Sequence, residues 1–167
     1  FIAVKNRNAR ALQAILSRGT DGRQKGESSA KADDAYMLAN AISPEGEPVI
    51  VAAAKLHDST ILRMLARAGA RVDACNPVDG VTALMVSVMS NDMTSARALM
   101  HHGADTNISD KKGRTPLMMA AFKGNRDMIS FLVKEGGSDQ DARDRKGNTA
   151  RRWFSHGLVN QKTKRIR

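Results

Sequence analysis

The chain repeats a short pattern with the same spacing along most of its length. GVTAL starts at Gly80, GRTPL starts at Gly113, and GNTA starts at Gly147. A second series, with starts at Gly69, Gly103 and Gly137, recurs with nearly the same period. Two series that share a period predict a stack of small units in which each unit contacts only its neighbours.

Residues 111 to 136 indicate that one unit is a pair of helices. Thr115 can cap free amides, and Pro116 suits the first turn of a helix because its missing N–H costs nothing there. Gly124 and Asn125 tolerate left-handed backbone and predict the turn that ends the first helix. The apolar positions before and after this turn follow helical spacing: Leu117, Ala120 and Ala121, then Met128, Ile129, Leu132 and Val133. One such hairpin cannot bury its own apolar faces, so it needs neighbours.

The segment T-P-L-M-M-A-A from Thr115 resembles the ankyrin repeat, whose signature is T-P-L-H-x-A in a unit of about 33 residues. Met118 replaces the histidine, and Met85 fills the same position one unit earlier. The resemblance covers roughly residues 46 to 157. It implies an all-α solenoid of stacked helix-turn-helix units with projecting loop fingers.

The expected organisation follows from this period. We expect a partial first repeat, an insertion with a polar loop and a short helix, three full repeats, and a capping repeat with a basic tail. The corresponding ranges are 1–21, 22–45, 46–79, 80–112, 113–146 and 147–167. The insertion is either functional or a tolerated surface loop.

Charge and composition limit the function classes. The formal net charge of +10 favours an acidic partner but does not identify one. No stretch reaches the length of apolar sequence that a membrane span needs, so we expect no membrane insertion. The single cysteine, Cys75, excludes an internal disulfide. The chain begins at Phe1, which suggests a trimmed chain or a mature form. The localisation is therefore cytoplasmic by the family's habit, or periplasmic if a bacterial leader precedes Phe1.

The resemblance implies that a partner meets the loop fingers and the inner helices. Exposed apolar residues at these positions would form one strip: Met89, Met119, Phe122 and Trp153. The alternative is that Phe122 and Trp153 turn inward and complete the core. Basic residues flank the strip and would steer an acidic partner: Lys111, Lys112, Arg114, Lys123, Arg145 and Lys146.

The sequence shows no pattern that predicts catalysis. The histidines have no metal-ligand spacing, and neither a nucleophile elbow nor a phosphate-binding glycine loop occurs. We therefore expect no enzyme activity, no metal and no cofactor.

Three functions are compatible with these features. The first is a non-catalytic module, monomeric when free, that binds another protein with an acidic surface. The second is an exported bacterial inhibitor or immunity protein that covers the active site of a partner enzyme, for which a cell-wall hydrolase is the example suggested by analogy. The third, disfavoured, is binding of nucleic acid or an anionic surface through the basic ends, which steep salt dependence would reveal.

Overall fold

The computed structural model describes residues 35–164, with side chains described as far as residue 157. The expected partial first repeat (1–21), the first part of the insertion (22–34), which includes its polar loop, and the last residues of the basic tail (165–167) lie outside the described residues. The boundaries proposed between the repeats stay predictions.

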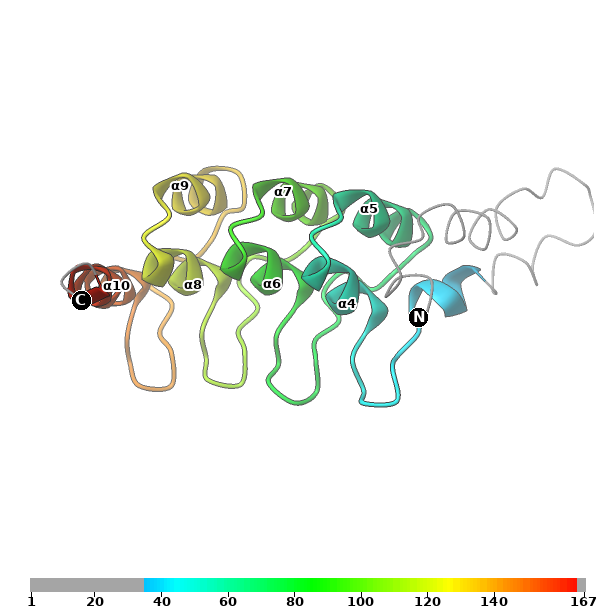
Figure 1. Cartoon of the computed structure of the whole chain (residues 1–167), viewed down its shortest axis with the longest axis horizontal. Helices are drawn as coiled ribbons and strands as arrows, with labels where there is room; N and C mark the ends of the chain where they lie inside the picture. Colours follow the sequence, from blue (N-terminus) through cyan, green and yellow to red (C-terminus); the bar gives the residue numbers. More distant parts are fainter. Residues whose placement is uncertain (1–34, 165–167) are drawn as a thin grey trace, which may run out of the picture.

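The described helices form two parallel rows with a third layer of loops beneath them (Figure 1). The inner row lies next to the loop fingers, and the outer row lies on the far side of it. The expected all-α fold of stacked helix pairs is confirmed, because the described residues contain isolated β-bridges but no strand. The inner helices are α4 (Val49–Lys55), α6 (Ala83–Met89), α8 (Pro116–Lys123) and α10 (Ala150–Lys164), and the outer helices are α5 (Ser59–Arg67), α7 (Met93–His101) and α9 (Arg126–Lys134).

Side-chain caps define where five of these helices begin, α5 to α9. Thr115 Oγ1 accepts a hydrogen bond from the backbone N–H of Met118 at 3.4 Å, and Thr82 caps α6 in the same way at 3.3 Å. The outer helices α5, α7 and α9 are capped by Asp58, Asp92 and Asn125. Each cap satisfies an amide that the first turn of a helix leaves without a partner.

A left-handed residue ends each of the first three inner helices. His57, Asn91 and Gly124 have φ values of 57°, 61° and 69°, and each lies nine positions after the N-cap of its helix. Leu158 occupies the corresponding position after Thr149, and α10 continues through it to Lys164. Leucine disfavours left-handed backbone, which explains why the chain does not turn there.

The core runs along the whole stack and is built from aliphatic side chains and methionines. Its largest fully buried members include Ile50, Leu84, Met118, Met128 and Leu132. Small residues such as Ala53 and Ala120 allow the inner helices to approach one another closely. Among the described helices, none combines the length and apolar character that crossing a bilayer requires.

Candidate partner-binding surface

A buried aspartate organises the base of each of the last two loop fingers. Asp110, 5% exposed, accepts hydrogen bonds from the backbone N–H groups of Lys112 and Arg114 at 2.9 and 2.8 Å. Its carboxylate also forms an ion pair with the Arg114 guanidinium at 2.6 Å. Asp144 occupies the same position one unit later and binds the backbone N–H groups of Lys146 and Asn148 at 2.9 and 2.8 Å. These contacts fix the direction in which each finger projects.

Asp144 also connects its finger to α10. Burial alone would raise the pKa of Asp144, but hydrogen bonds from Asn148, Lys146 and Trp153 outweigh that effect and hold the pKa below its ordinary value. The indole Nε1 of Trp153 donates to Oδ2 at 3.1 Å, and the amide Nδ2 of Asn148 donates to the same oxygen at 3.0 Å. Asp144 is therefore a structural anion in contact with donors of this chain.

Basic side chains surround this anion and line one pocket of about 540 Å³ between the last two fingers and α10. We refer to it as the basic pocket. Backbone hydrogen bonds join the fingers that form its wall, since the Arg145 N–H donates to the Lys112 carbonyl at 3.1 Å. The lining residues are Lys111, Lys112, Arg114, Asp144, Arg145, Lys146, Asn148, Arg152, Trp153 and His156.

The structure brings together the larger part of the residues that the sequence suggested as a binding site. The basic pocket contains Lys111, Lys112, Arg114, Arg145, Lys146 and Trp153. Phe122 lies beside the pocket, with its ring edge-to-face against Trp153 at a centroid distance of 5.5 Å. Met89 and Phe122 are 43% and 38% exposed, Trp153 is half-buried and Lys123 is exposed. Met89 and Lys123 do not line the pocket.

The expected exposure of Met119 is wrong. Its side chain is only 5% exposed and belongs to the core, because α6 and α10 pack on both sides of α8. The expected apolar strip is therefore not continuous. It consists of Met89 and Phe122, which occupy equivalent positions on neighbouring helices, and of the half-buried Trp153.

Sequence reasoning did not include four residues of the basic pocket among the candidate site residues. Arg152 and His156 flank Trp153 on one face of α10, at helical spacing that the sequence already contains. Asp144 and Asn148 carry no distinctive signal in the sequence, because a carboxylate and an amide on a loop indicate turn formation as readily as a site. In the described part of the chain, no group of three or more histidine, cysteine, aspartate or glutamate residues could hold a metal ion.

Comparison with known proteins places these features in a family context. The family model described as Ankyrin repeats (3 copies) matches residues 1–110 and 49–144. PhlB of Serratia liquefaciens is 36% identical over 77 residues, which are 46% of this chain and 34% of that protein. A putative ankyrin repeat-containing protein of Treponema pallidum (strain Nichols) is 30% identical over 100 residues, which are 60% of this chain and 34% of that protein.

A vertebrate protein matches over a larger share of its own length. The Notch-regulated ankyrin repeat-containing protein B of Danio rerio is 30% identical over 79 residues, which are 47% of this chain and 68% of that protein. By contrast, the chain spans about a third of the length of the Serratia and Treponema proteins.

Proposed function

The chain belongs to the ankyrin repeat family, whose members are non-catalytic protein-binding modules, and we propose that this one binds an acidic segment of a partner protein in the basic pocket. The observation that carries the proposal is the gathering of Lys111, Lys112, Arg145, Lys146 and Arg152 around one concave surface. Charges of one sign in a concave site attract ligands of the opposite sign and raise their association rate.

The charges in the basic pocket are largely available to a ligand. Within the described part of the chain, no ion pair involves Lys112, Arg145, Lys146 or Arg152. Asp144 is the carboxylate among the lining residues. Its oxygens already accept hydrogen bonds from four donor groups of this chain: the backbone N–H groups of Lys146 and Asn148, the side-chain amide of Asn148 and the indole of Trp153. Carboxylates of a partner would therefore supply the missing counter-charges.

The aromatic pair beside the pocket supports a protein ligand. Trp153 and Phe122 are both partly exposed and pack edge-to-face, so they present a rigid apolar edge next to the cations. Interfaces use such aromatic side chains as anchors, surrounded by polar contacts that exclude water. We infer that the preferred ligand is an acidic stretch that also carries an apolar or aromatic residue.

Two alternative functions would use the same cations, and the binding experiment below also tests them. An exported inhibitor or immunity protein would place the basic pocket over an acidic catalytic cleft, and cell-wall hydrolases that use paired carboxylates have such clefts. A nucleic-acid ligand would use the same cations to bind phosphates. It differs in its salt dependence, because each neutralised phosphate releases counterions.

The test measures binding of short synthetic peptides through the fluorescence of Trp153, the single tryptophan of the chain. The probes are a peptide rich in aspartate and glutamate with one phenylalanine, a version with lysine in place of the acids, and an oligothymidine strand. We expect saturable binding of the acidic peptide, and at least about tenfold weaker binding by Lys146→Glu and Arg152→Glu variants.

Lys134→Glu is the matched control, because Lys134 is an exposed cation in the last turn of α9 and does not line the pocket. Its affinity for the acidic peptide should remain within about twofold of the original. Equal losses in all three variants would mean that net charge, rather than this pocket, is responsible. Preference for oligothymidine over the peptide would replace the proposal by nucleic-acid binding.

A further inference from the structure

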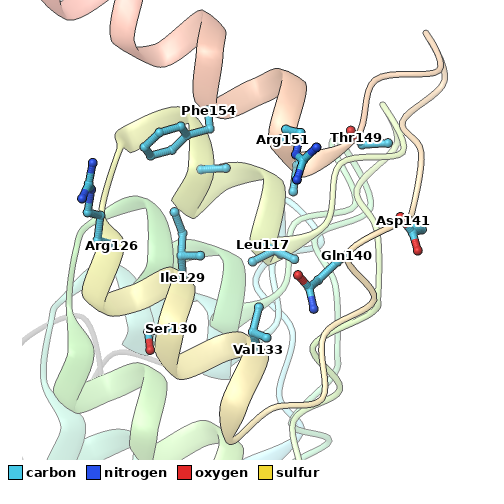
Figure 2. Close-up of a pocket in the computed structure, with 12 residues that line it drawn as sticks. Leu117, Arg126, Ile129, Ser130, Val133, Gln140, Asp141, Thr149, Arg151 and Phe154 are labelled. Atoms are coloured by element: carbon cyan, nitrogen blue, oxygen red, sulfur yellow. The ribbon is translucent and has the colours of Figure 1, made fainter.

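A groove of about 690 Å³ opens between α9 and α10 (Figure 2). We refer to it as the C-terminal groove. Its α10 lining, Ala150, Arg151 and Phe154, differs from that of the basic pocket, which uses Arg152, Trp153 and His156. Figure 2 shows Val133 pointing from α9 toward Leu117, and Ile129 pointing from α9 toward Phe154 on α10. The lining residues are Leu117, Ala121, Arg126, Ile129, Ser130, Val133, Gln140, Asp141, Thr149, Ala150, Arg151 and Phe154.

Ile129 occupies a position that is sealed in the two preceding outer helices. It lies four residues after the cap Asn125, where α5 and α7 have Leu62 and Ala96 after their own caps. Leu62 is 1% exposed and Ala96 is 0% exposed, whereas Ile129 is half-buried. The difference arises because another outer helix follows α5 and α7 in the row, and none of the described helices follows α9 there (Figure 1).

The described residues do not supply that next helix themselves. After each earlier inner helix the chain turns at a left-handed residue and returns as an outer helix. Leu158 stands at this position in α10, and the helix continues to Lys164 instead of returning over the groove. The groove thus lies where a further outer helix would pack and has an apolar floor, and no helix of residues 35–164 occupies it.

The rim of the groove is more positive than a site for another repeat would require. Arg151 stands at the position of Ile50, Leu84 and Leu117, which are at most 2% exposed in their own helices. Arg126 lies at the other end of the groove, and neither guanidinium takes part in an ion pair within the described part of the chain. One carboxylate, that of Asp141, lies among the lining residues.

From these contacts we propose that the C-terminal groove binds an amphipathic helix of a partner protein, lying beside α9 in the place of a further outer helix. Its apolar face covers Ile129, Val133 and Phe154. Acidic residues on its flanks pair with Arg126 and Arg151, so the charge of the groove selects an acidic helix over a basic one. This site is separate from the basic pocket and does not depend on the function proposed for it.

The test uses a synthetic helical peptide of about 18 residues, long enough to hold helical structure when stapled. It carries leucines at i, i+3, i+4 and i+7 with glutamates on both flanks, and a second version carries lysines in place of the glutamates. Methyl NMR signals of Ile129 and Val133 report binding in the groove, and the Trp153 indole signal reports binding in the basic pocket. We expect saturable shifts at Ile129 and Val133 with the glutamate peptide, and at least about tenfold weaker binding of the lysine peptide.

Two variants keep this test decisive. Ile129→Asp should weaken the glutamate peptide at least about tenfold, whereas Val78→Asp should leave its affinity unchanged, because Val78 is 75% exposed on another finger. Arg151→Glu replaces an exposed residue, is expected to fold normally by circular dichroism, and should shift the preference toward the lysine peptide. The proposal fails if shifts occur only at Trp153, if the two peptides bind equally, or if neither Ile129→Asp nor Arg151→Glu changes binding.

Discussion

The indole Nε1 of Trp153 donates a hydrogen bond to Oδ2 of Asp144 at 3.1 Å. This bond joins α10 to the base of the finger formed by residues 138–146, and both elements line the basic pocket together with the preceding finger. The same indole ring packs against Phe122 on α8. One side chain therefore holds the pocket together and presents an aromatic surface to it.

Replacing Trp153 with phenylalanine should separate these two roles. Phenylalanine keeps an aromatic ring near Phe122 but removes the N–H donor to Asp144. We expect the free energy of unfolding to fall by about 1.5 to 3 kcal/mol, the usual contribution of a hydrogen bond to a charged acceptor. Urea titration followed by circular dichroism measures this change. Trp153→Ala should cost more, because the ring contact with Phe122 also disappears.

Asp144 should make stability depend on pH. The folded state holds the pKa of Asp144 below its ordinary value, so the unfolded chain binds this proton more readily. The stabilisation is fully present above the ordinary pKa of about 4, and it is lost as pH falls through the lower, folded value. Asp144→Asn should therefore reduce the free energy of unfolding by about 2 kcal/mol at neutral pH.

The difference between the original chain and Asp144→Asn should shrink as the pH is lowered from 7 toward 2. Urea titrations at several pH values measure it. Asp127→Asn serves as the control, because Asp127 is an exposed residue in the first turn of α9. A difference for Asp144→Asn that stays constant with pH would show that its effect comes from packing and not from the charge.

Met119 and Met89 offer a matched comparison between core and surface. Met119→Ala should lower the free energy of unfolding by about 2 to 4 kcal/mol, because it opens a cavity beside a buried side chain. Met89, at 43% exposed, should lose less than about 1 kcal/mol when replaced by alanine. Thermal melts of both variants, recorded under the same conditions, check the difference. Similar losses would show that Met89 also contributes to the core.

These two methionines also show how far the sequence could predict the structure. The repeat period and the cap residue Thr115 predicted the helix pair, because Thr115 accepts from an amide only three positions away. The period also predicted that the basic residues of neighbouring fingers lie close together, because residues one period apart lie side by side in a solenoid. The exposure of Met119 depends on how closely α6 and α10 approach α8, which periodicity does not specify.

The contact between Trp153 and Asp144 could not be predicted from the sequence, for a related reason. Its formation requires the turn of α10 that carries Trp153 to lie against the base of the finger, and that depends on how α10 packs. The packing of α10 on α8 was not predicted in detail, because the pattern of small residues ends after Ala150. The C-terminal groove has the same origin, since it exists only because α10 does not turn at Leu158.

Substitutions at Gly124 should measure the backbone strain of the left-handed turn that ends α8 and that α10 lacks. Its φ is 69°, a conformation that disfavours residues with a Cβ, so Gly124→Ala should lower the free energy of unfolding by about 1 kcal/mol. The equivalent residue Asn91 tolerates this backbone better than alanine does, and Gly124→Asn should therefore cost less. Urea titration of the two variants ranks them. A larger loss for asparagine would point to crowding around the side chain instead of backbone strain.

Salt should distinguish the proposed protein ligand of the basic pocket from a nucleic acid. An acidic peptide that pairs with Lys112, Lys146 and Arg152 and also contacts Trp153 keeps an apolar share of its binding energy, which salt does not screen. Raising the salt from about 50 to 200 mM should therefore weaken it by on the order of tenfold, less than the loss of 10³-fold or more expected for a ligand with many phosphate contacts.

The Trp153→Phe variant, followed with a fluorescein-labelled peptide, should bind more weakly at every salt concentration, with an unchanged dependence of affinity on salt. The Lys146→Glu variant should show a shallower slope, because one pair of opposite charges is gone. If Trp153→Phe changed the slope and Lys146→Glu did not, the assignment of charge and apolar contact within the pocket would be wrong.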